Sequence, residues 1–146
     1  MMKIPVMVID DETVDRYTAK RRLDKHGGFD EVVEVASGDQ FLENYCNEKN
    51  GLQPDRPLLI LIDINMPGRN GFETIAEFEK RQKLGIAPQA VVVMMFTSSG
   101  NPKDKAAAAS FSLVRGYIEK PLDAAGAEEL YQIYRAAFPD IVNAIA

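Results

Sequence analysis

The chain has 146 residues, a length that fits one domain and leaves little room for a second. Hydrophobic residues make up 46% and charged residues 27%, proportions that are typical of a globular protein and exclude a disordered or fibrous chain. The net charge of -5 makes nucleic acid and anionic lipid poor electrostatic partners, and the apolar runs are too short to cross a membrane.

The chain has a single cysteine, Cys46, and a single histidine, His26. These counts exclude an internal disulfide, a thiolate metal cage and most nucleophiles that need a nearby imidazole. The apolar run before Asp10 is too short for a secretory signal and has no cleavage site. We therefore expect a cytoplasmic location.

Strand-like segments alternate with helix-like segments along the chain. The first strand-like run, IPVMVI, lacks polar alternation, which is typical of a strand buried on both faces, whereas EVVEVA alternates as a half-exposed edge strand does. The predicted strands are residues 4–9, 31–36, 58–62, 90–96 and 116–118. The predicted helices are residues 13–25, 37–46, 71–83, 102–113 and 123–138.

Helix ends and helix faces can also be predicted. Gly27 ends the first helix, Ser37 caps the second with Gln40 in a capping-box position, and Pro102 suits the first turn of the fourth. The apolar residues that we expect to face the core are Val14, Tyr17 and Leu23 in the first helix and Phe72, Ile75, Ala76 and Phe78 in the third.

Five strands that are each followed by a helix predict an α/β fold with a parallel sheet and right-handed crossovers. Because five such units cannot close an eight-stranded barrel, we expect an open doubly wound (βα)₅ sheet. In the strand order 2-1-3-4-5, the carboxyl ends of strands 1, 3, 4 and 5 are neighbours, and sites in such sheets form at these ends.

Polar residues follow four of the predicted strands at that edge. Asp10-Asp11 follow the first strand, Asp63 the third, Thr97 the fourth and Lys120 the fifth. Several carboxylates in one cleft repel one another unless a cation is bound, and oxygen ligands without His or Cys favour Mg²⁺, with Mn²⁺ as a second choice. A lysine and a hydroxyl beside that cation would suit a phosphoryl group.

Four motifs at these strand ends resemble the signature set of two-component response-regulator receiver domains, the CheY-like family. They are IDDE at 9–12, DINMPGRNG at 63–71, TSS at 97–99 and GYIEKP at 116–121. Each motif alone is weak, but four in the right order are specific. The resemblance covers residues 4–138, leaves 139–146 as a C-terminal extension of a single domain, and implies the flavodoxin-like fold.

The resemblance implies a role for each matching residue. Asp63 is similar to the phosphoacceptor, and Lys120 and Thr97 are similar to the side chains that contact the phosphoryl group. Asp11, Asp63 and the Asn65 carbonyl are similar to the metal ligands, and Asp10 to a carboxylate that acts through a bound water. Thr97 and Tyr117 are similar to a switch pair, Asn65 and Ser99 to positions that set the phosphoryl lifetime, and Pro121 to the residue after a cis peptide bond.

The function implied is that of a phosphoacceptor in a two-component phosphorelay. A sensor histidine kinase or a histidine phosphotransfer protein would supply the phosphoryl group in a Mg²⁺-dependent reaction. The surface formed by the fourth helix, the fifth strand and the fifth helix would then regulate an unidentified protein target. The chain would catalyse only its own phosphorylation and dephosphorylation, with neither nucleic acid nor membrane as a direct partner.

Two alternatives remain open at this point. An aspartyl-nucleophile phosphohydrolase also places an aspartate after a buried strand, but it has an acid two residues later, where this chain has Asn65. A phosphate-independent adaptor on the same fold commonly lacks one of the acids or the lysine, all of which are present here.

The polar segment 47–57 is longer than usual in the family, and the turn at 111–115 carries larger residues than usual.

Overall fold

The structure, a computed structural model, describes residues 3–49, 55–98 and 100–139. Its centre is a five-stranded parallel sheet in the order β2-β1-β3-β4-β5, which confirms the predicted fold class and strand order. The strands are β1 (Val6–Ile9), β2 (Val33–Val35), β3 (Leu58–Ile62), β4 (Val91–Thr97) and β5 (Val114–Glu119). The helices are α1 (Thr13–His26), α2 (Gly38–Tyr45), α3 (Gly71–Lys83), α4 (Pro102–Ala109) and α5 (Ala124–Ala137).

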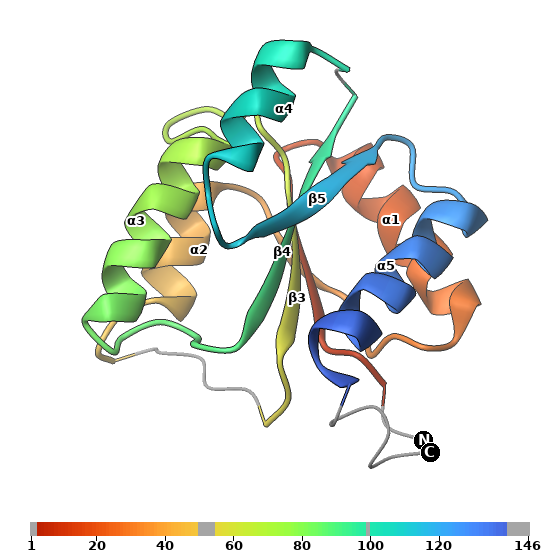
Figure 1. The fold of residues 1–146 in the computed structure, drawn as a ribbon, viewed down its shortest axis with the longest axis horizontal. Helices are drawn as coiled ribbons and strands as arrows, with labels where there is room; N and C mark the ends of the chain where they lie inside the picture. The colour runs from red at the N-terminus through yellow and green to blue at the C-terminus, as the bar shows by residue number, and fades with distance from the viewer. Residues whose placement is uncertain (1–2, 50–54, 99, 140–146) are drawn as a thin grey trace.

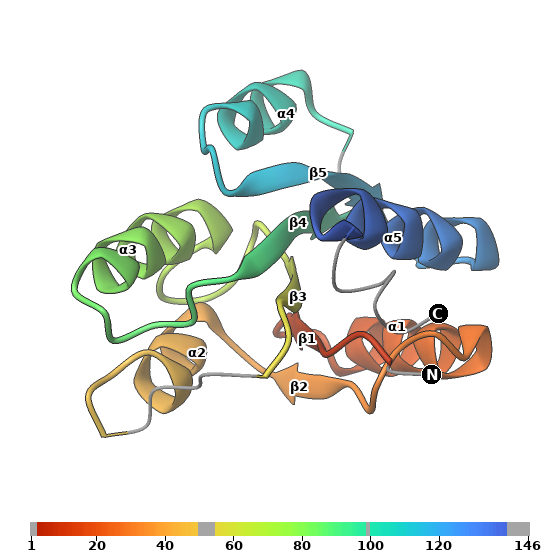
Figure 2. The same ribbon diagram turned by 60° about the horizontal axis from the view of Figure 1, so that its bottom comes forward.

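Helices cover both faces of the sheet. Figures 1 and 2 show α1 and α5 packed side by side on one face, and α2 and α3 on the other. Helix α4 lies against β5 on the side of α3, and its Ala108 joins the core of that layer. The last described residues of the chain lie near the start of β1. The opposite edge of the sheet, where the strands end, is formed by the loops that lead into the helices.

Successive side chains of the inner strands enter opposite layers, and both layers are apolar. On β3, for example, Ile60 belongs to the core beneath α2 and α3, whereas Leu59 and Leu61 belong to the core beneath α1 and α5. All residues of β1, β3 and β4 are buried. This double burial explains why these strands lack alternation of polar and apolar residues in the sequence.

Side-chain caps define the starts of four helices, and the cap of α4 is Asn101, which accepts a hydrogen bond from the Lys103 amide. The Ser37 hydroxyl accepts a hydrogen bond from the Gln40 amide at α2, and Asp123 caps α5 in the same way. The Gln40 side chain accepts from the Ala36 amide and not from that of Ser37, so the predicted capping box at α2 is displaced by one residue. A complete capping box is formed instead at α3 by Asn70 and Glu73.

The predicted inner face of α1 is partly wrong. Val14 is 72% exposed and Tyr17 is 59% exposed, while Ala19 and Leu23 are the buried residues of this helix. The helix packs on the sheet through Ala19 and Leu23, which belong to the core of this layer, so Val14 and Tyr17 fall outside the packed face. In α3, likewise, Ala76 is exposed and the neighbouring Thr74 is buried, where its hydroxyl donates to the Asn70 carbonyl.

The boundary between α4 and β5 also differs from the prediction. Helix α4 ends at Ala109 and not at residue 113, because the Ser110 hydroxyl and amide both donate to the Ala107 carbonyl and close the last turn. Strand β5 starts at Val114, which pairs with Val93 before a register shift in the ladder. Val114 is therefore part of the sheet and not part of a turn.

The first two strands are shorter than predicted. Pro5 has no amide hydrogen, and β1 begins only after it, although Ile4 forms an isolated bridge with Phe29. Parts of the segment 47–57 and most of the extension 139–146 lie outside the described residues. On the described side, the Tyr134 hydroxyl donates to the Pro57 carbonyl (2.7 Å), which attaches the approach to β3 to α5.

Cys46 follows α2 and is completely buried. Burial raises the pKa of its thiol from 9.0 to about 12, against the opposing effect of Arg81. We expect no reaction of the folded protein with Ellman's reagent at pH 8, and complete reaction in guanidinium chloride. Since the unfolded thiol ionises first, this group makes stability fall as pH rises from about 9 to 12. Rapid labelling of the folded protein would contradict this placement.

None of the helices within the described residues is long and apolar enough to cross a membrane.

Candidate functional site

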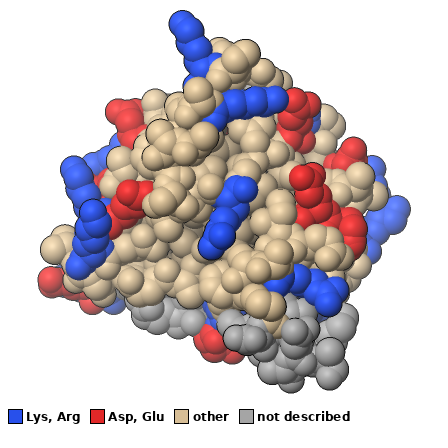
Figure 3. Space-filling view, viewed as in Figure 1, with Lys and Arg blue, Asp and Glu red and all other residues tan. Residues whose placement is uncertain are grey.

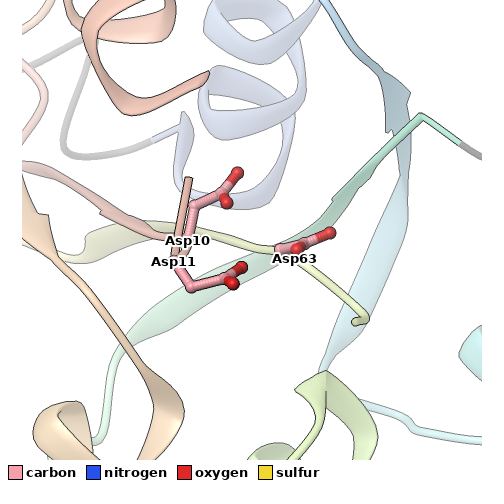
Figure 4. Close-up of side chains that lie close together, drawn as sticks. All are labelled: Asp10, Asp11 and Asp63. Atoms are coloured by element: carbon pink, nitrogen blue, oxygen red, sulfur yellow. The ribbon is translucent and has the colours of Figure 1, made fainter. Parts of the chain in front are cut away.

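Three carboxylates meet where β1 and β3 end. Asp10 and Asp11 follow β1, and Asp63 follows β3, so the parallel pairing of these neighbouring strands places the three residues side by side. Figure 4 shows their side chains projecting into one space beyond the sheet edge. Each offers an oxygen, and these oxygens lie within 4.8 Å of one another. Asp10 is fully buried, Asp63 is 6% exposed and Asp11 is half-buried.

Backbone hydrogen bonds position these residues. The Asp10 amide donates to the Val35 carbonyl (3.0 Å), and the Asp63 amide donates to the Ile9 carbonyl (2.9 Å). The sheet ladder thus continues up to the acidic residues themselves. Asp10 Oδ1 also accepts the Glu12 amide (2.9 Å), which fixes the carboxylate against the turn into α1. Positions held by a sheet ladder are better defined than positions on a free loop.

Lys120 reaches the acidic cluster from the end of β5. Its Nζ lies 2.5 Å from Asp10 Oδ2 and 3.4 Å from Asp63 Oδ1, and its side chain is 7% exposed. The Lys120 amide donates to the Thr97 carbonyl (2.9 Å), which joins the ends of β4 and β5, and the Lys120–Pro121 peptide bond is cis, as expected. The cluster therefore includes a buried cation before any metal is considered.

Burial and neighbouring charges set the ionisation of the pair. Burial raises the pKa of Asp63 to about 6, with Lys120 opposing and Asp10 adding to the rise. Burial alone would lower the pKa of Lys120, but the carboxylates of Asp10, Asp15 and Asp63 outweigh that effect and raise it. At neutral pH the site therefore contains a charged lysine and an excess of negative charge, an arrangement that favours a bound cation.

Thr97 and Tyr117 lie together at the ends of β4 and β5. Thr97 is 1% exposed, and its side chain forms a hydrogen bond with the Tyr117 hydroxyl. Burial raises the pKa of Tyr117, and the bond to Thr97 opposes that rise. Lys105 of α4 places its Nζ 5.5 Å from the centre of the Tyr117 ring. The Tyr117 side chain thus contacts both Thr97 at the end of β4 and Lys105 on α4.

The remaining predicted positions lie around the cluster. Asn65 is exposed in the β3–α3 loop, two residues after Asp63. Ser99 falls outside the described residues. The loop is held to α2 by the ion pair between Arg69 and Asp39 (2.6 Å). The structure thus brings together four of the predicted residues, Asp10, Asp11, Asp63 and Lys120. Thr97 lies at the end of β4, the strand between β3 and β5.

Two residues at the site were missed. Asp15 Oδ2 lies 3.0 Å from Lys120 Nζ, and the Arg16 guanidinium donates to the Asp10 carbonyl (2.6 Å) while pairing with Glu34 (3.4 Å). Both residues are in the first turns of α1. The signal that could have found them is position, because a helix that starts directly after a strand end presents its first turn to that edge of the sheet.

The donor set fits a small, hard divalent cation. All three clustered side chains are carboxylates, and two of them are buried where uncompensated negative charge is costly. Carboxylate, carbonyl and water oxygens are the ligands that Mg²⁺ prefers, and the exposed Asn65 loop beside Asp63 offers carbonyl groups. The residues present therefore suit Mg²⁺ better than a metal that prefers nitrogen or sulfur.

The chain is similar to known proteins in sequence and in fold. A family model of the response regulator receiver domain matches residues 6–134. Protein PilH of Pseudomonas aeruginosa is 27% identical over 118 residues, which are 81% of this chain and 86% of PilH. A crystal structure of a two-component response regulator from Cytophaga hutchinsonii superimposes with a TM-score of 0.72 at 31% identity, covering 90% of this chain and 96% of that one.

A longer relative shares only this unit. A protein-glutamate methylesterase/protein-glutamine glutaminase of Alkalilimnicola ehrlichii is 33% identical over 97 residues, which are 66% of this chain and 21% of that protein. The chain thus spans about a fifth of the length of this relative, and the likeness concerns the shared segment.

The fold and the acidic edge define a signalling domain of the α/β class. The chain belongs to the response regulator receiver domain family, since the family model covers most of its length. It is a receiver domain of a two-component response regulator. Receiver domains typically bind Mg²⁺ at an acidic pocket, and this chain has a cluster of three carboxylates, Asp10, Asp11 and Asp63.

Proposed function

We propose that the chain accepts a phosphoryl group on Asp63 in a Mg²⁺-dependent reaction. The observation that carries this proposal is the placement of Asp63 between two further carboxylates and a buried lysine at one end of the sheet. Asp10, Asp11 and Asp63 would hold the metal, together with the Asn65 carbonyl. The donor would be the phosphohistidine of a sensor kinase or of a phosphotransfer protein, which implies the cytoplasm as the site of action.

The proposed transfer is an in-line displacement. An Asp63 carboxylate oxygen attacks the phosphorus, the phosphorus–nitrogen bond of the donor breaks, and the imidazole leaves with the electron pair. The chemistry that a bound Mg²⁺ supplies is neutralisation of charge on the phosphoryl oxygens. Lys120 would contact one phosphoryl oxygen and Thr97 would donate its hydroxyl to another. Water attack on phosphorus later breaks the bond to Asp63 and releases inorganic phosphate, which resets the protein.

The output surface in this proposal is the face formed by α4, β5 and α5. An open groove of about 900 Å³ lies there, with Tyr117 and Gly116 among its lining residues. Figure 3 shows that this face is mostly uncharged, with basic side chains over α4 and β5 and acidic ones toward α5. A phosphoryl group that draws on the Thr97 hydroxyl would change the partner of Tyr117, and this change would alter the groove presented to a target protein.

Two alternatives are less well supported. A phosphohydrolase would need an acid near residue 65, where the exposed side chain is Asn65. A phosphate-independent adaptor would have no need for a buried lysine in contact with two buried carboxylates, because such groups are costly to bury.

Mass spectrometry after incubation with acetyl phosphate tests the proposal. We expect one added phosphate in the presence of Mg²⁺, none with EDTA, and none in Asp63→Asn. Addition that persists in Asp63→Asn would show another acceptor, and no addition under any condition would contradict the proposal. Turnover of p-nitrophenyl phosphate by the same preparation would instead favour the phosphohydrolase.

A further inference from the structure

Lys120 is shared by three carboxylates that come from three different elements. Its Nζ lies 2.5 Å from Asp10 Oδ2, 3.0 Å from Asp15 Oδ2 and 3.4 Å from Asp63 Oδ1. The contact with Asp15 is thus shorter than the contact with the proposed phosphoacceptor, and it includes a direct hydrogen bond. Of the three carboxylates, only Asp15 belongs neither to a strand end nor to the acidic cluster of Figure 4.

Asp15 is the third residue of α1, and its side chain is 33% exposed. An acidic residue in a first helical turn also interacts favourably with the helix dipole, and this alone could explain its presence. A dipole role does not require contact with a particular cation, however. Here the side chain accepts a hydrogen bond from the Lys120 ammonium group, which also contacts Asp10 and Asp63.

The geometry points to Asp15 as a positioning residue that holds the Lys120 ammonium on the α1 side of the pocket. In that position the lysine neutralises Asp63 less completely, so the cluster keeps more negative charge for a metal ion. The lysine must then leave Asp15 to reach a phosphoryl oxygen on Asp63. This inference rests on the proposed function, because it assigns Asp15 a part in metal binding and in the response to the phosphoryl group.

Two effects of opposite sign follow from removal of the Asp15 charge. Without Asp15, Lys120 moves toward Asp63 and competes with the metal, so the affinity for Mg²⁺ should fall about three- to tenfold. A lysine already free to contact Asp63 should bind a phosphoryl oxygen more readily, so the affinity for a phosphoryl analogue should rise by a similar factor. General damage to the site would lower both affinities together.

The experiment compares Asp15→Asn with Asp15→Glu and with a matched control, Glu12→Gln. Glu12 is an exposed acidic residue at the same end of α1, and within the described residues it forms no ion pair with Lys120. Calorimetric titration measures Mg²⁺ affinity, and beryllofluoride affinity is measured at saturating Mg²⁺. We expect Asp15→Asn to weaken Mg²⁺ and strengthen beryllofluoride, Asp15→Glu to retain wild-type values, and Glu12→Gln to leave beryllofluoride affinity within about twofold.

A third measurement needs no metal. Melting temperatures of wild type, Asp15→Asn, Lys120→Met and the double variant form a cycle in EDTA, in which Asp15→Asn should lower the melting temperature by about 2–4 °C only when Lys120 is present. If Lys120→Met does not fold, the two titrations decide alone. Equal losses of both affinities, no change in either, or additive melting temperatures would overturn the inference. If the wild type binds neither Mg²⁺ nor beryllofluoride, the proposed function fails, while the cycle still tests the contact between Asp15 and Lys120.

Discussion

Replacing Gly71 with alanine is expected to lower the free energy of unfolding by about 3 kcal/mol and the melting temperature by about 10 °C. Gly71 is the first residue of α3, and its amide donates to the Ile64 carbonyl (2.8 Å). A Cβ atom at this position would lie 2.3 Å from the Asp63 carbonyl oxygen and 3.1 Å from the Ile64 Cα. Because these are backbone atoms, no side-chain rotation relieves the clash, and α3 or the end of β3 must move.

The displaced backbone is that of Asp63, so the same variant should phosphorylate slowly even at temperatures where it is folded. Thermal unfolding and phosphorylation by acetyl phosphate measure the two effects. Gly100→Ala is the matched control, because a Cβ there meets only the Glu119 side chain at 3.5 Å. We expect the control to change stability by less than about 0.5 kcal/mol. Wild-type stability of Gly71→Ala would mean that the helix and the strand end are less tightly joined than described.

In the absence of divalent ions, Asp63→Asn should stabilise the protein at pH 7 by about 2–3 kcal/mol. The Asp63 pKa is about 6 in the folded protein, against 3.8 for an ordinary carboxyl, because burial disfavours the charged form. A raised pKa contributes stability that is fully present below pH 3.8 and is lost as pH rises through about 6. The asparagine does not ionise, so the variant does not lose this stability.

Urea unfolding at several pH values checks the sign of this effect. The two proteins should have similar stabilities near pH 4 and diverge between pH 4 and 7, with the wild type becoming the less stable one. Saturating Mg²⁺ at pH 7 should stabilise the wild type more than Asp63→Asn, since the ion binds the carboxylate of the folded state. A variant that is less stable than the wild type at pH 7 in EDTA would contradict the electrostatic description of the site.

Much of this arrangement could be predicted from the sequence, because strong local signals agree with the fold. The five aliphatic residues 58–62 form β3 with the predicted bounds, and α3 spans the predicted residues 71–83. Asp63 was placed correctly because the end of a buried parallel strand defines its position. The carboxylates and Lys120 were predicted to converge because strand order places these ends side by side.

Features that depend on packing between elements could not be predicted. The large apolar side chains of Val14 and Tyr17 suggested the inner face of α1, but the helix packs through the small Ala19. The length of α4 was overestimated because its alanine-rich sequence contains no residue that marks the end of a helix. The helix ends where the Ser110 hydroxyl donates to the Ala107 carbonyl, a contact that the sequence does not reveal. The contact of Asp15 with Lys120 links residues 105 positions apart, and no local pattern predicts such a pair.

The outward placement of Val14 has a mechanical consequence. Val14 and Asp15 are adjacent in the first turn of α1, and one faces solvent while the other holds Lys120. A rigid movement of this turn therefore displaces an exposed apolar side chain and a buried ammonium at the same time. The first turn of α1 therefore connects an apolar side chain that is accessible to other molecules with the carboxylate that contacts Lys120 in the acidic pocket.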